Sequence, residues 1–464
     1  AKKMVDDMCK AGIIKLLTEK DPPSDWLAPA FFAPKPGQPD KLRLLTDFRA
    51  LNSQVSRPVR SFNTGEQIWR QVKPDSKFFI SMDALGAYHQ VRISEDSKQY
   101  CRFLLPWGAY QYESAPMGFI SSGDIWNIVS DEALTGSAAL KEVDDILLQS
   151  SSISGLAQEL DDVLNRCKKK TITISKKKVN LTTSENGHKI PFAGFMIGRE
   201  GCTPDPKKVN AIANMDPPCD LTSLRSFLGL CNTFAHWLPD LSHTAKPLRE
   251  LLKKGRAYVW LDCHQQSFDK LKELLTSDLC LSPFDPAKKS YLVSDASKTG
   301  IGFLLLQDAE VTKPEDKLKG AKDKVDLTKK RLIWCGSAAL SATQFRYPPI
   351  MLELLSAVWS MESCQYYLKG GPKFDYISDH LPLKSILKKN IEDIPPRLLP
   401  LVERTFGYNF DTKFVRGSRN LASDCLSRQV NYGQELDVAD EVVRRIVMEA
   451  SEQVRQDPAM SDIF

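Results

Sequence analysis

The stretch Glu142-Val143-Asp144-Asp145-Ile146-Leu147-Leu148 places two adjacent carboxylates between apolar residues. The apolar flanks predict the two strands of a tight hairpin, with the acids on its turn. Adjacent acids also occur at Asp6-Asp7 and Asp161-Asp162, where solvated helix faces explain them, so a pair alone does not define a site. Two acids on a sharp turn differ, because both can reach one metal ion.

A lone carboxylate upstream supports this interpretation. Phe78-Phe79-Ile80-Ser81-Met82-Asp83 is an apolar run that ends in an acid, which predicts a strand with Asp83 at its end. One carboxylate from a strand end and two from a neighbouring hairpin can hold two divalent cations about 3.5–4 Å apart. We therefore predict that Asp83, Asp144 and Asp145 are catalytic and bind metal.

The order of these motifs is similar to that of a known family. The chain resembles the reverse transcriptases of gypsy-type LTR retrotransposons and their retroviral relatives, up to about Arg428. The resemblance rests on Leu45-Thr46-Asp47-Phe48-Arg49-Ala50-Leu51-Asn52, Met82-Asp83, Gly86-Ala87-Tyr88-His89-Gln90 and Val143-Asp144-Asp145-Ile146-Leu147. It implies a multidomain α+β and α/β fold: a right-hand polymerase with fingers, palm and thumb, then a connection and a ribonuclease H-like α/β domain.

The resemblance also implies substrate-binding residues. Arg43 matches the triphosphate-binding arginine and Lys35 approximately the neighbouring lysine, while the Tyr88 ring would lie under the sugar and exclude a 2′-hydroxyl. Alternatives from the residues alone are an exposed charged hairpin for Arg43, a core position for Tyr88 and a buried hairpin for the primer-gripping strands. The remaining positions are Met117 and Gly118 in the nucleotide loop, and Phe192 and Gly194 in the primer-gripping hairpin.

Two places depart from the family pattern. Ser122-Gly123-Asp124-Ile125-Trp126-Asn127 stands where the family has Ala-Pro-x-x-Phe-Gln, and Glu142 stands where it has an aromatic residue that touches the primer end. Glu142 either faces the primer and repels its phosphates, or points away and pairs with a basic side chain such as Lys141 or a thumb lysine.

A second set of acids follows Lys289. An apolar helix that carries Glu353 is expected from Ile350 to Leu368, and a short strand from Phe374 to Ser378 is expected before Asp379. Asp295, Glu353, Asp379 and Asp424 each match a carboxylate of the ribonuclease H domain of such reverse transcriptases, within Asp295-Ala296-Ser297, that helix, Ser378-Asp379-His380 and Asn420-Leu421-Ala422-Ser423-Asp424. The resemblance implies that these four also bind metal and are catalytic. Some ribonucleases H carry a histidine in the loop before the last acid. None lies between His380 and Asp424 here, so the resemblance implies slower product release.

The resemblance divides the chain into four parts. These are fingers and palm at 1–200, thumb and connection at 201–286, ribonuclease H at 287–428 and an acidic spacer at 429–464. The segment 313–331 is interpreted as a surface insertion. The first residue is Ala1, and the chain is interpreted as a piece of a longer polyprotein.

The implied cofactor is Mg²⁺, two ions per active site, with Mn²⁺ as a substitute. The implied partners are an RNA template, a DNA or RNA primer, an RNA/DNA hybrid and deoxynucleoside triphosphates, while self-association stays open. The expected location is the cytoplasm, in a virus-like particle.

Composition and charge are consistent with these expectations. The 464 residues are 42% hydrophobic and 26% charged, as in globular proteins, and contain no apolar run of about 18 residues, so no membrane partner is expected. Eleven cysteines without a Cys-x-x-Cys pair disfavour a zinc knuckle. From Asn431 onward the net charge is −5, so the first 430 residues carry +10. This excess favours a nucleic-acid partner.

Three functions fit the sequence. The leading one is an enzyme that copies RNA into DNA and degrades the RNA. Glu142 and the segment around Gly123 motivate the alternative, a domesticated or decayed element protein that binds nucleic acid without efficient polymerisation. A nuclease alone would need the later acids and not the first three. The complete set of seven carboxylates favours the enzyme with both activities.

Overall fold

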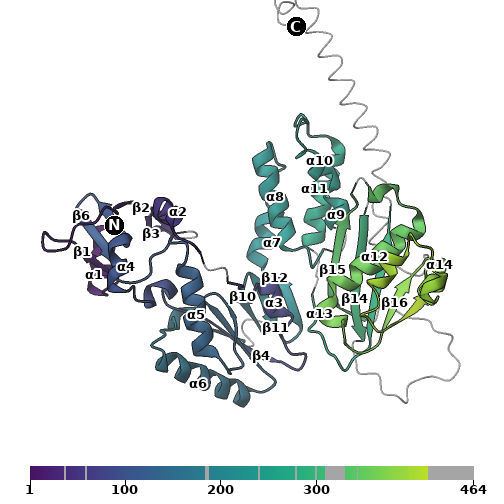
Figure 1. Ribbon diagram of the computed structural model, residues 1–464, viewed down its shortest axis with the longest axis horizontal. Helices are drawn as coiled ribbons and strands as arrows, with labels where there is room; N and C mark the ends of the chain where they lie inside the picture. The colour runs from purple at the N-terminus through teal and green to yellow at the C-terminus, as the bar shows by residue number, and fades with distance from the viewer. Residues whose placement is uncertain are drawn as a thin grey trace, which may run out of the picture. The chain divides into compact units, whose positions relative to one another are not determined.

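The computed structural model describes residues 1–35, 38–57, 60–182, 188–238, 241–276, 280–297, 300–308, 330–341 and 343–415. The chain forms two compact units, Ala1–Arg199 and Glu200–Phe464 (Figure 1). None of the helices in these ranges is long and apolar enough to cross a membrane. Asp424 and the acidic segment 429–464 lie outside the described residues, and the four-part division of the chain stays a prediction.

The first unit begins with a five-stranded sheet in the order β1-β6-β5-β2-β3. The antiparallel pair β2 and β3 is the hairpin that the sequence predicts around Arg43. Apolar side chains of the sheet and of the first two helices pack into one core, in which Phe103 and Tyr112 are almost fully buried. The elements are α1 (Lys2–Lys10), β1 (Ile14–Leu16), β2 (Ala28–Lys35), β3 (Gln38–Thr46), α2 (Arg49–Gln54), α4 (Glu95–Lys98), the 3-10 turn η2 (Gln99–Cys101), β5 (Arg102–Leu105) and β6 (Gly108–Tyr112).

The second sheet of this unit has the order β7-β8-β4-β9 and carries the first acids. Helices α5 and α6 pack on it, and their apolar residues form a core with the sheet that contains Trp126 and Leu148 (Figure 1). The elements are β4 (Phe78–Asp83), the 3-10 turn η1 (Ala87–Gln90), α5 (Ser122–Leu134), β7 (Leu140–Glu142), β8 (Asp145–Ser150), α6 (Ile153–Lys169), the 3-10 turn η3 (Lys176–Lys178) and β9 (Asn180–Leu181). The hairpin predicted around Asp144 and Asp145 is thus β7 and β8.

A third pair of strands, β10 (Lys189–Phe192) and β11 (Phe195–Gly198), forms an antiparallel hairpin. It packs against the short helix α3 (Gly65–Trp69) so closely that a Cβ at Gly65 would lie 2.8 Å from Ala193 and from Phe195. The Ser81 hydroxyl in β4 donates to the carbonyl oxygen of Pro191 over 3.2 Å, which attaches the hairpin to the acid-bearing sheet.

The second unit combines a group of helices with a mixed sheet. Buried Phe227 of α8 and Phe268 of α11 pack against each other, their ring centroids 4.6 Å apart, in the core of the helical part. The elements of this part are β12 (Gly201–Pro204), α7 (Pro206–Ala213), α8 (Leu221–Thr233), α9 (Leu241–Thr244), α10 (Lys246–Glu250) and α11 (Asp262–Leu275).

The sheet of the second unit has the order β15-β14-β13-β16-β17. Strands β13, β16 and β17 are parallel, while β14 and β15 are antiparallel to their neighbours, and the long helix α12 covers β13 and β14. The elements are β13 (Ser290–Ala296), β14 (Gly300–Asp308), β15 (Lys330–Ala339), η6 (Gln344–Arg346), α12 (Pro349–Ser363), α13 (Gln365–Leu368), β16 (Phe374–Ser378), α14 (Leu381–Ile386), η7 (Ile391–Asp393), α15 (Leu399–Glu403) and β17 (Phe410–Phe414).

Two expectations about this sheet need correction. The insertion expected to reach Arg331 ends earlier, because Lys330 and Arg331 already belong to β15 and pair with Asp308 and Gln307 of β14. The apolar helix expected to run unbroken to Leu368 ends at Ser363, and α13 begins at Gln365.

Candidate active sites

The first acid set lies where β4 ends and the β7–β8 hairpin turns. Asp83 and Asp145 are directly opposite each other in the β4–β8 ladder, so their side chains are on the same face of the sheet. Asp144 occupies the turn between them, and its carbonyl oxygen accepts a 3.0 Å hydrogen bond from the backbone N–H of Ala84. Main-chain pairing therefore brings the three carboxylates together.

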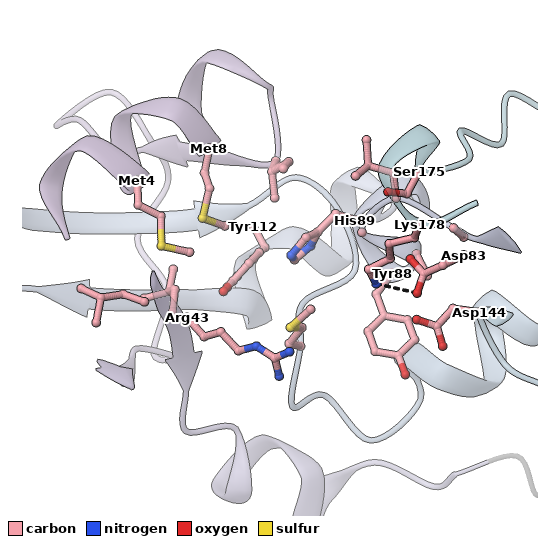
Figure 2. A pocket seen from close by; sticks show the side chains of 18 residues that line it. Met4, Met8, Arg43, Asp83, Tyr88, His89, Tyr112, Asp144, Ser175 and Lys178 are labelled. Atoms are coloured by element: carbon pink, nitrogen blue, oxygen red, sulfur yellow. Dashed lines mark hydrogen bonds and ion pairs between the residues drawn. The ribbon is translucent and has the colours of Figure 1, made fainter. Parts of the chain in front are cut away.

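A cavity of about 420 Å³ opens beside these acids. Asp83, Asp144 and Tyr88 line one part of it, and Arg43 from β3 lines the opposite part (Figure 2). Figure 2 shows the Arg43 guanidinium pointing into the space that the Tyr88 ring and the Asp144 carboxylate border. A phosphate chain placed here would have the Arg43 guanidinium at one end and the carboxylates of Asp83 and Asp144 at the other.

Burial and mutual repulsion disfavour the charged forms of the acids in the first set, and the positive charge of Lys178 only partly offsets this effect. Burial, with added repulsion from Asp83, raises the pKa of Asp144. Burial and the charges of Asp144 and Asp83 raise the pKa of Asp145 to about 6. The Lys178 ammonium donates to Oδ2 of Asp83 over 2.6 Å and opposes these shifts (Figure 2).

This donor set fits divalent cations. Hard cations take carboxylate oxygens, and a cation beside Asp144 would supply the compensation that burial denies it. The three acids are spread more widely than those of the second set described below, so a bound ion would be shared chiefly by Asp83 and Asp144 on the cavity wall. Asp145 does not line this cavity.

The second acid set is more compact. Asp295 at the end of β13, Glu353 in the first half of α12 and Asp379 just after β16 each offer an oxygen, and these oxygens lie within 4.8 Å of one another. Strands β13 and β16 are parallel, so their carboxyl ends meet at the same edge of the sheet. The sequence prediction that these acids converge agrees with this geometry, while Asp424 lies outside the described residues.

Glu353 is the most perturbed acid of this set. Its side chain is buried, and burial together with the charges of Asp295 and Asp379 raises the pKa to about 9. Its Oε2 atom has no hydrogen-bond partner in the structure. A buried carboxylate oxygen without a donor is expected where a cation binds, so this set also fits a divalent metal.

Neighbouring hydroxyls hold these elements in place. The Ser356 hydroxyl, one turn after Glu353 in α12, donates to the carbonyl oxygen of Asp295 over 2.9 Å. The hydroxyls of Ser294 and Tyr376 are 2.8 Å apart and connect β13 to β16. The helix and both strands that carry the acids are therefore tied together beside the site.

The predicted substrate-binding residues fall into different environments. Tyr88 lines the cavity of the first set and a second cavity of about 340 Å³, which Gly118 also lines. Asn52 fixes the loop that contains Met117 and Gly118: its amide donates to the carbonyl oxygen of Gly118 over 2.9 Å and accepts from the Ile120 N–H over 3.0 Å. Arg43, Tyr88, Met117 and Gly118 are thus close to the first acids.

The predicted primer-gripping residues do not reach these cavities. Phe192 is buried and pairs with Phe195 in the β10–β11 hairpin, and burial of this hairpin is compatible with a contact to the primer. Gly194, with a φ of 82°, forms the turn of that hairpin. Lys35 is the last residue of β2, and its side chain lies outside the described part of the chain.

Glu142, the sharpest departure from the family pattern, has a defined partner. Its Oε1 atom accepts a 3.1 Å hydrogen bond from the backbone N–H of Gly65, at the start of α3. Lys141 does not pair with it; the Lys141 ammonium is buried and forms an ion pair with Asp131 over 2.7 Å. Glu142 therefore joins the β7–β8 hairpin to α3 through a contact that the sequence did not predict.

Two further groups at the first site were missed by sequence reasoning. Lys178 is the last residue of the basic run Lys176-Lys177-Lys178, and its contact with Asp83 spans 95 positions. Met4 and Met8 of α1 also line the first cavity (Figure 2). Their spacing of four residues places them on one helix face, which was the available signal.

Two family models match the chain where these sites lie. Residues 33–207 match "Reverse transcriptase (RNA-dependent DNA polymerase)", and residues 285–403 match "RNase H-like domain found in reverse transcriptase". The chain carries a reverse transcriptase domain followed by a ribonuclease H-like domain. The first domain contains the Asp83, Asp144 and Asp145 set, and the second contains Asp295, Glu353 and Asp379.

Relatives share both domains. The chain is 26% identical over 441 residues to the Tf2-3 transposon polyprotein of Schizosaccharomyces pombe, which covers 91% of the chain and 31% of that polyprotein. It is 26% identical over 444 residues to the retrovirus-related Pol polyprotein from transposon opus of Drosophila melanogaster, with 92% and 41% covered. The chain thus spans between about a third and two fifths of the length of these LTR-retrotransposon polyproteins.

A solved structure has the same fold. The foamy viral protease-reverse transcriptase in complex with an RNA/DNA hybrid matches with a TM-score of 0.68 and 18% identity, over 90% of this chain and 53% of that one. The likeness confirms the expected combination of a reverse transcriptase fold with a ribonuclease H-like domain.

The raised pKa of Glu353 gives the ribonuclease H-like domain a testable pH dependence. The folded domain keeps the Glu353 proton up to about pH 9, while the unfolded chain releases it near the ordinary value of 4.5. The free energy of unfolding should therefore fall as pH rises between these values, by an amount on the order of a few kcal/mol. Thermal unfolding in a chelator from pH 5 to pH 9 measures this.

The matched control is Glu353→Gln, which is neutral at every pH. Its melting midpoint should lose most of the downward slope, and Mg²⁺ should stabilise the parent more at pH 8 than at pH 5, because the cation binds the ionised carboxylate. Identical pH slopes for parent and variant would show that Glu353 does not carry the effect.

Proposed function

We propose that this chain copies RNA into DNA and degrades the RNA strand of the resulting hybrid. The observation that carries the proposal is the placement of Asp83 and Asp144 on one cavity wall with Arg43 across from them, inside a reverse transcriptase domain. The substrates proposed are a primer annealed to an RNA template, deoxynucleoside triphosphates and an RNA/DNA hybrid. The hybrid in the foamy viral complex supports this choice of nucleic acid.

The residues of the first site can be given roles by their chemistry. Arg43 offers a planar guanidinium to the triphosphate, a geometry suited to two parallel hydrogen bonds to phosphate oxygens. Asp83 and Asp144 would chiefly hold Mg²⁺, with Mn²⁺ as a substitute, near the α-phosphate, and Asp145 is proposed as the third acid of this set. Tyr88 borders the same cavity, where its ring would lie against the sugar.

At the second site, Asp295, Glu353 and Asp379 would hold the cations, and Asp424 is proposed as their fourth acid. In both sites the bound cations would lower the pKa of the attacking oxygen, a primer hydroxyl or a water, and neutralise the charge on the leaving group. The protein contributes the fixed positions of the acids, because strands β13 and β16 and helix α12 are bonded to one another beside the site.

The described residues do not favour the decayed-element alternative. Glu142 bonds to the Gly65 N–H, and Asp124, in the other departing segment, is fully buried and pairs with Arg57 over 2.6 Å. Residues that depart from the family pattern are thus integrated into the structure of the palm.

The two activities should be separable by single substitutions. Asp144→Asn should abolish primer extension, because the metal site loses a charged ligand, and should leave cleavage of an RNA/DNA hybrid near the parental rate. Glu353→Gln should do the reverse. Primer extension and hybrid cleavage with Mg²⁺ are measured on the same folded preparations, checked by their melting curves.

The outcome that contradicts the proposal is specific. Extension by Asp144→Asn at the parental rate would mean that the acids of the β7–β8 turn are not catalytic. Loss of both activities in either folded variant would mean that the two sites do not act independently.

Tyr88 should determine sugar selectivity. Tyr88→Ala removes the ring that would collide with a ribose 2′-hydroxyl, so ribonucleotide incorporation should rise at least about tenfold relative to deoxynucleotide, equivalent to ~1.4 kcal/mol. The measurement is the ratio of catalytic efficiencies for matched ribo- and deoxynucleotides. Tyr88→Phe is the control, since it keeps the ring and should keep the ratio; equal ratios for all three proteins would make Tyr88 a packing residue.

A further inference from the structure

We propose that Trp126 is a positioning residue for polymerisation. Its indole N–H donates to the carbonyl oxygen of Val143, and this bond lets helix α5 hold the β7–β8 turn in the conformation that directs Asp144 into the cavity. The inference rests on the proposed polymerase function and assigns a new role within it.

The backbone of the β7–β8 turn is strained, so contacts from outside the turn are needed to stabilise its conformation. Val143 has a φ of 54°, in the left-handed region, which is sterically unfavourable for a β-branched residue. Val143 immediately precedes Asp144, so relaxation of this residue to a negative φ would redirect the peptide that carries the metal-binding carboxylate. Strain of this kind persists where the surroundings determine the conformation.

Two hydrogen bonds fix the turn from opposite sides. The Trp126 indole Nε1 lies 2.9 Å from the carbonyl oxygen of Val143, and the backbone N–H of Ala84 lies 3.0 Å from that of Asp144. The second bond comes from the main chain at the end of β4, whatever the side chains there. The first depends on the identity of one side chain, and a phenylalanine at position 126 could not form it.

Helix α5 is itself anchored to the hairpin, so Trp126 acts from a fixed support. The buried Lys141 ammonium in β7 donates to the side chains of Asn127 and Ser130 in α5, over 2.5 and 2.6 Å. At the start of the helix, the Ser122 hydroxyl donates to the carbonyl oxygen of Pro116 over 2.7 Å. Helix α5 therefore links the nucleotide loop to the catalytic turn.

A simpler role for Trp126 is packing, because its side chain is only 1% exposed and lies in the core beneath the sheet. Trp126→Phe keeps an aromatic ring there and removes the donor. Trp237→Phe is the matched control: the buried Trp237 indole also donates to a backbone carbonyl oxygen, that of Cys202, over 3.1 Å, but in the second unit. Both variants lose the same type of bond, and only one of these bonds holds the turn.

The test measures single-turnover nucleotide addition on a primer annealed to RNA, with the full chain. Trp126→Phe should lower the rate constant of addition by about tenfold or more, since small misplacements of reacting groups cost this much. The apparent dissociation constant of the nucleotide should stay within about twofold, because Arg43 and Tyr88 are untouched. Trp237→Phe should leave both quantities at the parental value.

A double-mutant cycle separates positioning from packing. Glycine adopts a positive φ without steric strain, so the turn of a Val143→Gly variant no longer depends on the Trp126 hydrogen bond. In this background, Trp126→Phe should lower the rate constant of nucleotide addition by less than about twofold. The same loss factor in both backgrounds would overturn the proposal. So would a parental rate for Trp126→Phe.

A binding measurement keeps the inference testable apart from activity. Mn²⁺ titration of the Asp295→Asn chain, in which the second acid set is weakened, should show weaker binding when Trp126→Phe is added and no change with Trp237→Phe. Unchanged Mn²⁺ affinity would overturn the positioning role. If the parent chain failed to extend primers, the proposed function would fail while this titration still decided the role of Trp126. If Trp126→Phe melted below the assay temperature, Trp126→Met, which also fills an apolar core and has no donor, would be measured in its place with the same expected outcomes.

Discussion

Carboxylates of like charge are held close together at both sites by elements that cannot move apart without breaking main-chain pairing. Asp83 and Asp145 are opposite each other in the β4–β8 ladder, and Asp295 and Asp379 lie at neighbouring ends of parallel strands. The consequence is visible in the raised pKa values of Asp145 and Glu353. The carboxylates repel one another, and a bound cation would reduce this repulsion. The surrounding elements must therefore be rigid enough to keep the acids in place before a cation binds.

The two sites achieve this rigidity in a similar way. In each, a helix packed on the acid-bearing sheet donates a side-chain hydrogen bond to a backbone carbonyl oxygen at or next to one of the clustered acids. Trp126 of α5 bonds to Val143, and Ser356 of α12 bonds to Asp295. At the first site a lysine, Lys178, forms an ion pair with one of the acids, Asp83. The Lys178 side chain is more than half exposed, so its ion pair with Asp83 contributes little free energy. A metal ion can therefore replace the Lys178 ammonium beside Asp83 at little cost.

Short-range sequence patterns predicted the strands and the hairpin that carry the acids of both sites. The apolar run ending in Asp83, the hairpin around Asp144 and the strand before Asp379 are each determined by residues next to the acid. Contacts between distant segments were not predictable in this way. The Glu142 contact with Gly65 and the Lys178 contact with Asp83 join positions 77 and 95 residues apart, and no local pattern encodes them. The strand β15 was also missed, because its start lies in a lysine-rich stretch typical of a surface loop.

Each acid set is proposed to bind divalent cations at the place where its reaction occurs. The most direct measurement is anomalous X-ray scattering from crystals of the full chain grown with Mn²⁺ and a primer annealed to its template. The proposed binding predicts anomalous density beside Asp83 and Asp144, and separately among Asp295, Glu353 and Asp379. Mn²⁺ density located away from both sets, with these carboxylates bonded to protein groups alone, would contradict it.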